Sequence, residues 1–231
     1  MIADYKGLGE HVERLRSLSF RIGAYRPPSE GGSASLLLRV NENCPWNRCA
    51  FCEMYKGHRF VYRPVDEITA DIDRVAAIRD EITAVSFKLG MGGEITRDLG
   101  AALLAEGLDL VGNPGFVTVF NWLASGARTA FLQDADSMSM RPREFMAVLA
   151  HLRRTLGSLT RVTTYTRSKT LSKRTPQDLR MIREAGLDRL HIGLESGDDE
   201  VLALVNKGVT SAEQIEGGRK AIAAGFQVSE Y

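Results

Sequence analysis

Short apolar runs alternate with longer amphipathic segments along most of this chain. Continuous apolar runs of four to six residues are typical of strands that are buried on both faces. The first such run is residues 35–40, SLLLRV. From residue 129 onward the alternation becomes regular. It predicts strands at 129–133, 161–165, 189–194 and 226–230. It also predicts helices at 141–155 and 211–224, and a further helix that begins at Pro176 with Thr175 as its N-terminal cap. Strands that alternate with helices in this way indicate an α/β fold with a parallel sheet.

The region before residue 129 is less regular. Isoleucine and valine at helical spacing predict a helix over 66–79. The run TAVSF at 83–87 is interpreted as a strand, and 90–94 as a loop. Helical stretches follow near 97–108 and 117–125. We expect an N-terminal extension over 1–34, which begins helical and ends in a Pro-, Gly- and Ser-rich loop at 26–33, and one core domain over 35–231.

Composition changes this picture little. Hydrophobic residues make up 44% of the chain and charged residues 26%, as in ordinary globular proteins. The formal net charge of +1 gives no overall basic field for nucleic acid. We expect no membrane span, since no apolar run of about 18 residues occurs, and no signal peptide. The three cysteines are close together and odd in number, which indicates a reducing compartment, the cytoplasm, and no disulfide framework.

Three polar motifs follow predicted strands. The cysteine segment comes directly after 35–40, QDAD ends the strand at 129–133, and GLES ends the strand at 189–194. The carboxyl ends of parallel strands meet at one edge of a sheet, where ligands of such folds bind. The sequence therefore predicts that these three motifs share one rim.

The segment NCPWNRCAFC spaces its cysteines as C-x4-C-x2-C, at Cys44, Cys49 and Cys52. Thiolates are the ligands of iron–sulfur clusters. A [4Fe–4S] cluster held by three cysteines keeps one iron open for another ligand, and the chain has no fourth cysteine. Two alternatives remain open. His58 could complete a Cys3His zinc site in a binding module, or the cysteines could be a merely structural set.

The cysteine segment, QDADS and HIGLESGDDEVLALVNKGVT, in this order, resemble the radical SAM superfamily over about residues 25–231. More narrowly they resemble its coproporphyrinogen III oxidase-like group, which shares the x4 spacing; the commonest superfamily motif is C-x3-C-x2-C. The resemblance implies a partial parallel (β/α) barrel. Such barrels generally have six strands, and this chain ends in what would be the fifth, so we expect a barrel truncated at the C-terminus. A truncated homologue that keeps the cluster but lacks activity is a further alternative.

The resemblance also implies an activity. A [4Fe–4S] cluster and S-adenosylmethionine (SAM) would be the cofactors, and a flavodoxin- or ferredoxin-like protein would supply the electron. Reductive cleavage of SAM would then yield a 5′-deoxyadenosyl radical that abstracts hydrogen from a substrate. Nothing in the sequence identifies that substrate or a catalytic residue acting on it.

Six side chains are the candidate SAM contacts that the resemblance implies. Phe51 would lie beside the adenine, Asp134 and Asp136 would hold the amino group, Glu195 the ribose hydroxyls and Lys207 the carboxylate, with Tyr165 lining the pocket. Several of these assignments have competitors. Phe51 could be an ordinary core aromatic, and Lys207 a solvated lysine at a helix end. Gly92-Gly93-Glu94 spells the superfamily's GGE motif and could replace QDADS, and Asp136 could cap a helix. We expect His191, inside an apolar strand, to be a packed core residue.

Overall fold

Five parallel strands form the sheet that carries the candidate site. The computed structural model describes residues 7–24 and 35–231, so the predicted loop at 26–33 lies outside the described residues. The strands are β1 (Ser35–Arg39), β4 (Thr129–Gln133), β5 (Arg161–Thr166), β6 (Arg189–Ile192) and β7 (Gln227–Glu230), in the spatial order β1-β4-β5-β6-β7. Every neighbouring pair is parallel, which confirms the predicted α/β class.

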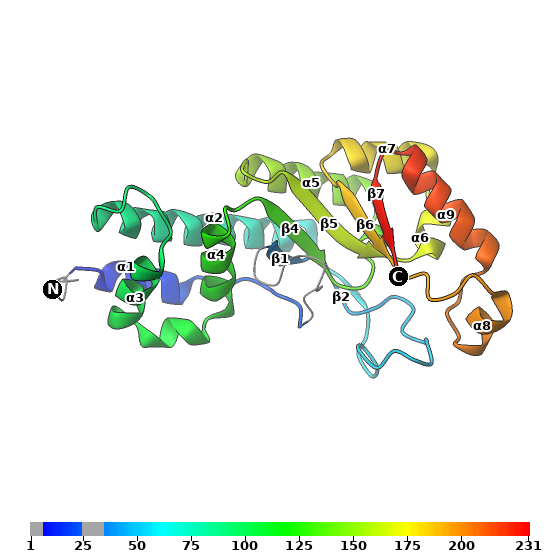
Figure 1. Ribbon diagram of the computed structural model, residues 1–231, viewed down its shortest axis with the longest axis horizontal. Coiled ribbons are helices and arrows are strands. Elements are labelled where there is room, and N and C mark those ends of the chain that lie inside the picture. The colour runs from blue at the N-terminus through cyan, green and yellow to red at the C-terminus, as the bar shows by residue number, and fades with distance from the viewer. Residues whose placement is uncertain (1–6, 25–34) are drawn as a thin grey trace.

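Helices cover one face of this sheet (Figure 1). They are α2 (Val65–Lys88), α5 (Pro142–Thr155), α7 (Pro176–Glu184) and α9 (Ser211–Ala223), with the short α6 (Ser168–Lys173) and α8 (Asp199–Leu204) near the carboxyl ends of the strands. Leu38, Leu132 and Leu190 belong to the apolar core that these helices close. Because side chains alternate along a strand, Phe131 and His191 face the opposite, inner side.

A helical lobe lies between β1 and β4 in the sequence. It contains α3 (Arg97–Glu106), the 3-10 helix η2 (Leu108–Gly112) and α4 (Pro114–Ala124), and α1 (Gly9–Ser17) packs against it. Figure 1 shows this lobe at the end of the molecule away from the C-terminus. Val12 and Leu15 of α1 are fully buried in the same core as α2.

The predicted strand at 83–87 is wrong, because α2 continues through it to Lys88. Ile82 and Val85 are fully buried and extend the apolar face that Ile78 belongs to, at spacings of four and three residues. Both intervals fit a helix, and TAVSF is simply the last turn and a half of α2. The GGE motif at 92–94 consequently follows a helix instead of a strand.

The other predicted elements agree with expectation within a few residues, and the structure adds the short helices α6 and α8, the 3-10 helices and a second small sheet. Thr175 caps α7 through its hydroxyl, which accepts a hydrogen bond from the Asp178 amide at 3.0 Å, and Pro176 is the first helical residue. The small sheet is an antiparallel pair of two-residue strands, β2 (Asn41–Glu42) and β3 (Val61–Tyr62). This pair closes the base of the cysteine segment. No helix in the described part of the chain is both long and apolar enough to traverse a membrane.

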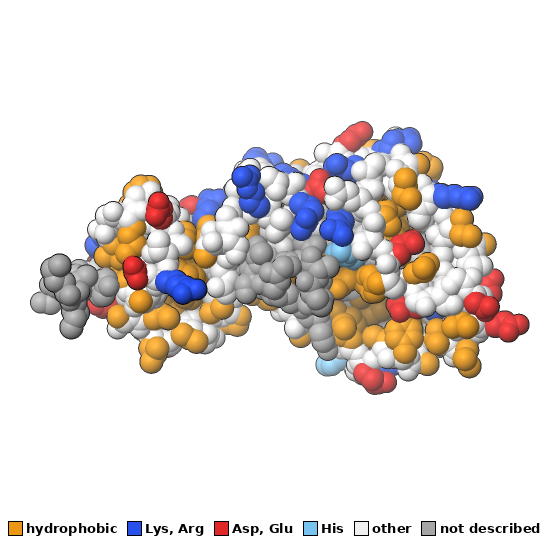
Figure 2. Space-filling model, in the orientation of Figure 1, with side chains coloured by type: hydrophobic (Ala, Val, Ile, Leu, Met, Phe, Trp, Pro, Cys, Tyr) orange, Lys and Arg blue, Asp and Glu red, His pale blue; other side chains and the backbone are white. Residues whose placement is uncertain are grey.

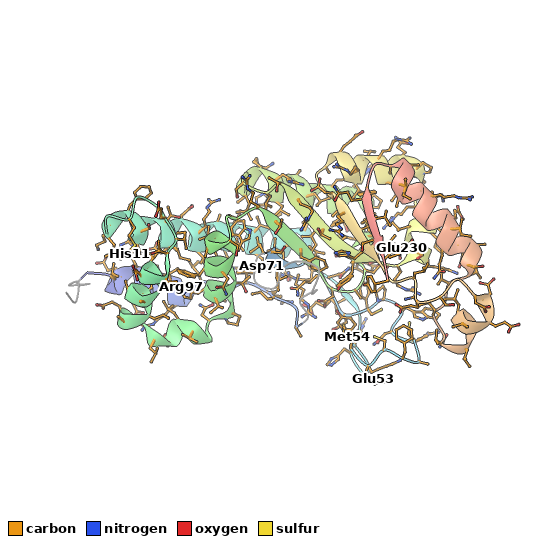
Figure 3. The ribbon with its side chains drawn as sticks, in the orientation of Figure 1. His11, Glu53, Met54, Asp71, Arg97 and Glu230 are labelled. Carbon is orange, nitrogen blue, oxygen red and sulfur yellow. The ribbon has the colours of Figure 1, made fainter. Side chains whose placement is uncertain are left out.

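A buried ion pair connects α2 to the rim of the sheet. The Arg63 and Asp71 side chains are 2% and 4% exposed and lie 2.7 Å apart. Arg63 also donates to the carbonyl of Arg39, the last residue of β1. Asp71, labelled in Figure 3, receives a second guanidinium from Arg74, whose side chain is 47% exposed. Arg63 thus joins α2 to the end of β1.

We expect Arg63→Met to lower the free energy of unfolding by about 3 kcal/mol, because it leaves the Asp71 carboxylate buried with weakened compensation. Arg74→Met removes the exposed partner of the same carboxylate and is the matched control, with an expected loss below about 1 kcal/mol. Urea unfolding of the two variants measures both values. Equal losses would show that burial of the Arg63 pair is not what matters.

Candidate functional site

A pocket of about 400 Å³ opens at the carboxyl ends of the strands, between the sheet and the cysteine segment. Figure 2 shows a hollow in this part of the molecule, bordered by hydrophobic side chains. All three cysteines line the pocket, as do five of the six predicted SAM contacts: Phe51, Asp134, Tyr165, Glu195 and Lys207. The structure therefore brings together the motifs that the sequence placed on one rim.

The cysteine loop, residues 43–60, leaves the sheet after β2 and returns at β3. Asn43 and Asn47 adopt positive φ angles of 68° and 49°, which turn the chain around Cys44. The Lys56 ammonium donates to the Cys49 carbonyl at 3.0 Å. Figure 3 shows Glu53 and Met54 on this loop, below the sheet. The three thiols are half-buried and form no disulfide.

The thiol of Cys49 is affected by its surroundings in two opposing ways. Burial raises the pKa of this thiol, and the positive charges of Lys207 and Arg167 act against that rise. Two cations close to a cysteine favour the thiolate, which is the form that binds a metal. The loop therefore presents its cysteines to the basic side of the pocket.

The spacing of the thiols bears on the kind of metal site. In the described part of the chain, no three His, Cys, Asp or Glu side chains lie close enough together to share one metal ion. Ligands of a single zinc ion must all lie about 2.3 Å from it, whereas the cysteines of a cluster each bind a different iron. His58 is exposed and does not line the pocket. Three thiols that line one pocket are compatible with a cluster in which each cysteine binds a different iron.

Asp134 anchors the start of the cysteine loop. Its Oδ2 accepts hydrogen bonds from Arg39 Nε and Nη2, at 2.9 and 2.7 Å, and from the Asn43 amide at 2.8 Å. Its side chain is only 2% exposed. The backbone of Gly23 lies against Oδ1, where an added Cβ would be 2.4 Å away. Asp134 therefore holds the start of the cysteine loop against the end of β1, whether or not its Oδ1 contacts a ligand.

Asp136 does not reach the pocket. The strand ends at Gln133, so the alternation expected to place Asp134 and Asp136 on one side breaks down. The Asp136 carboxylate is fully buried and accepts hydrogen bonds from the hydroxyls of Thr166 and Thr170. It makes no helix-capping hydrogen bond. Burial raises the pKa of Asp136, against the effect of the two hydroxyls. Asp136 therefore ties β4 to the segment after β5; it lies outside the pocket lining, and it precedes the 3-10 helix η3 (Ser137–Ser139) without capping it through its side chain.

Glu195 and Lys207 form an ion pair on the pocket wall. Lys207 Nζ lies 2.8 Å from Glu195 Oε1, and the lysine side chain is only 9% exposed. Glu195 has a φ of 66°, and its amide and that of Leu194 donate to the Tyr231 carbonyl. A Cβ on Gly193 would lie 2.8 Å from Glu195 Oε1 and 2.9 Å from Lys207 Nζ. The GLES motif therefore needs its glycine to bring these two charges together.

Aromatic rings form the floor of the pocket. Tyr165 contacts Phe131 edge-on at 5.0 Å between centroids and approaches Tyr231 at 6.0 Å. His191 is 2% exposed and stacks on Phe131 at 6.1 Å, so it is packed as predicted, although on the inner face of the sheet. Phe51 is 51% exposed, and the Lys207 ammonium lies 5.7 Å from its ring centroid. The ring of Phe51 is thus available to a flat ligand.

Sequence reasoning missed three residues that build the site. Arg39 ends β1 and neutralises Asp134, Arg167 follows β5 and lines the pocket, and Tyr231 lines it from the end of β7. The signal was present for the first two, because each is a cation at the carboxyl end of a predicted strand. GGE lies on the turn after α2 and does not line the pocket.

Substitution of Asp136 tests its structural role. Near pH 4, we expect Asp136→Asn to change the free energy of unfolding by less than about 1 kcal/mol, since an amide can still bond both threonine hydroxyls. Asp136→Ala leaves those hydroxyls without an acceptor and should lower the free energy of unfolding by about 2 kcal/mol or more. Chemical unfolding of both variants checks this, and equal losses would contradict it.

The raised pKa of Asp136 also predicts a pH dependence. The folded state holds this proton to a higher pH than the unfolded chain does, so stability associated with the neutral acid is lost as pH rises through the folded-state pKa. The wild type should therefore lose stability relative to Asp136→Asn as pH rises above about 4, the ordinary pKa of an aspartic acid. A difference between the two proteins that is independent of pH would contradict this.

Comparison with known proteins adds the family. The sequence profile of the radical SAM superfamily matches residues 116–231, which is half of the chain and does not include the cysteine loop. No curated protein matches the sequence.

Two solved structures of the cobalamin-dependent S-adenosylmethionine radical enzyme OxsB, one with aqua-cobalamin bound and one apo, are similar to this chain. Each has a TM-score of 0.49, at 18% and 17% identity respectively. Both matches cover 84% of this chain, which spans 23% of the OxsB chain. The five-stranded parallel sheet is accordingly a partial (β/α) barrel, and the chain belongs to the radical SAM superfamily.

Proposed function

We propose that this chain binds a [4Fe–4S] cluster on Cys44, Cys49 and Cys52 and SAM in the adjoining pocket, as a radical SAM enzyme. The observation that carries this proposal is the meeting of three thiols with the Glu195–Lys207 ion pair on one pocket, in a chain without a fourth cysteine. When bound, the cluster supplies an electron that cleaves SAM into methionine and a 5′-deoxyadenosyl radical, which abstracts hydrogen from a substrate.

The residues of the chain would bind and orient SAM by their charge and shape. Phe51 offers its ring to the adenine, and Glu195 offers carboxylate oxygens to the ribose hydroxyls. Lys207 and the Asp134 Oδ1 oxygen match the carboxylate and the amino group of SAM, through charge-assisted hydrogen bonds. Tyr165 and Phe131 close the pocket from below and exclude water from it. Asp136 has no part in this binding.

An electron donor would meet the exposed side of the cysteine loop. The cations Arg48 and Arg59 are exposed on this loop, together with the carboxylate of Glu53. This surface suits a small acidic reductant such as a flavodoxin- or ferredoxin-like protein. The C-x4-C-x2-C spacing supports the narrower assignment to the coproporphyrinogen III oxidase-like group. The substrate stays unidentified.

Cys49→Ala should abolish cluster assembly, because two cysteines cannot hold the cube at three corners. The measurement is the iron and sulfide content of protein purified without air, together with its visible absorption. His58→Ala is the matched control, a change of another possible ligand on the same loop, and should keep the full iron content. If the wild type contains zinc in place of iron, and both Cys49→Ala and His58→Ala lose that zinc, the protein is a zinc-stabilised binding module instead.

Incubation of the wild type with SAM and dithionite without air should yield 5′-deoxyadenosine. Cys49→Ala should yield none. A wild type that assembles the cluster and yields no 5′-deoxyadenosine is the outcome expected of a homologue without activity.

Glu195→Ala should keep the cluster and weaken SAM binding by about tenfold or more, since charged hydrogen bonds are lost. Glu230→Ala removes a carboxylate from neighbouring β7 that does not line the pocket, and should bind SAM as the wild type does. Equilibrium binding to reconstituted protein measures both. Wild-type affinity in Glu195→Ala would refute its proposed role.

A further inference from the structure

Trp46, between the first two cysteines, lies on the turn at residues 206–208 of the NKG motif. Its indole Nε1 donates to the Asn206 carbonyl at 2.8 Å. The two residues are 160 positions apart in the sequence, so this contact joins the cysteine loop to the far side of the pocket. An indole N–H held by a backbone carbonyl fixes both the position and the orientation of the ring.

The turn can accept this ring only because residue 208 is glycine. Gly208 has a φ of 70°, and an added Cβ would lie 2.3 to 2.7 Å from three carbons of the Trp46 ring. A Cβ at such distances cannot exist without displacing the ring. The indole therefore packs directly on the backbone of the turn.

Arg167 contacts the same ring system. Its guanidinium carbon lies 5.1 Å from the centroid of the Trp46 ring, and that of Arg48 lies 5.2 Å away. Arg167 Nη2 also donates to the Lys207 carbonyl at 2.7 Å. A cation near an indole face is attracted by the ring quadrupole. Arg167 thus contacts both Trp46 and the turn at 206–208, which also contact each other.

The same turn carries groups of the proposed SAM site. Lys207, between Asn206 and Gly208, pairs with Glu195 and lies near the ring of Phe51. The amide of Ala50 donates to the Val205 carbonyl at 2.8 Å, just before the turn. Both segments between cysteines, 45–48 and 50–51, therefore contact the element that presents Lys207.

We propose that Trp46, Arg167 and Gly208 form a clasp that sets the cysteine loop against the Lys207 turn. Trp46 acts as a positioning residue: it touches no reacting atom, but it fixes the thiols relative to the charges that would bind SAM. The inference rests on the proposed function, and it adds that retention of the cluster and affinity for SAM depend on one contact. Loss of the clasp should impair both together.

The test compares five variants with the wild type. Trp46→Ala removes the ring, and Trp46→Phe keeps a ring but loses the indole N–H. Gly208→Ala adds the clashing Cβ, and the double variant Trp46→Ala/Gly208→Ala removes what it clashes with. Gly90→Ala is the matched control, because Gly90 has a φ of 75° and open space where its Cβ would lie. It imposes the same backbone strain without any contact to the loop.

The first readout needs no metal. Hydrogen exchange of residues 44–52 in the cluster-free protein should be about tenfold faster in Trp46→Ala and in Gly208→Ala, because the docking contacts are lost. Trp46→Phe should give an acceleration between those of the wild type and Trp46→Ala, because it keeps an aromatic ring but loses the hydrogen bond to Asn206. The exchange rate of the double variant should match that of Trp46→Ala within about twofold, since both single changes break the same contact between Trp46 and Gly208. Gly90→Ala should leave this segment unchanged.

The second readout uses the reconstituted holoprotein. Trp46→Ala and Gly208→Ala should retain less iron and should need about tenfold more SAM to change the spectrum of the reduced cluster, with Trp46→Phe between them and the wild type. Unchanged exchange of residues 44–52 in Trp46→Ala, or additive effects in the double variant, would overturn the clasp. A wild type without iron would refute the proposed function instead, and the exchange data would still decide whether the clasp exists.

Discussion

The ion pair between Arg39 and Asp134 is the contact on which the site depends. These residues end β1 and follow β4, two neighbouring strands, and their side chains lie 2.7 Å apart at the rim of the sheet. The same carboxylate oxygen binds the Asn43 amide, directly before Cys44. A charge buried to this degree must stay paired, since removal of one partner of a buried pair is costly. The cysteine loop therefore begins at a point that is determined by the electrostatics of the sheet.

A second ion pair lies at the far end of the pocket. There Lys207 comes from a turn and Glu195 from the end of β6, and the two charges again neutralise each other. Between the two pairs lies an aromatic floor made by Phe131 and Tyr165. A ligand that carries both an ammonium and a carboxylate group meets both signs of charge in such a pocket. This is the physical basis of the proposal that SAM, a ligand of that kind, binds here.

Much of the fold could be predicted because strand and helix periods differ clearly in the second half of the chain. The strand at 129–133 and the cap at Thr175 were predicted at their observed positions. The failure at 83–87 has the same origin, since five residues of mixed character fit the end of a helix as well as a short strand. Asp136 failed for a different reason. Its assignment assumed that the strand persists beyond Gln133, and the backbone turns there instead.

The sequence by itself determined the parallel α/β class, the order of the motifs and the choice of thiols, because these follow from local periodicity and from residue chemistry. It also placed three polar motifs on one rim, since the carboxyl ends of parallel strands must share an edge. Only the tertiary structure decided which charges pair, that Asp136 faces Thr166 and Thr170, and that Trp46 lies on the Gly208 turn. The contacts of Asp136 and Trp46 join residues that are 30 to 160 positions apart. Their partners are selected by packing in three dimensions, which no local pattern records.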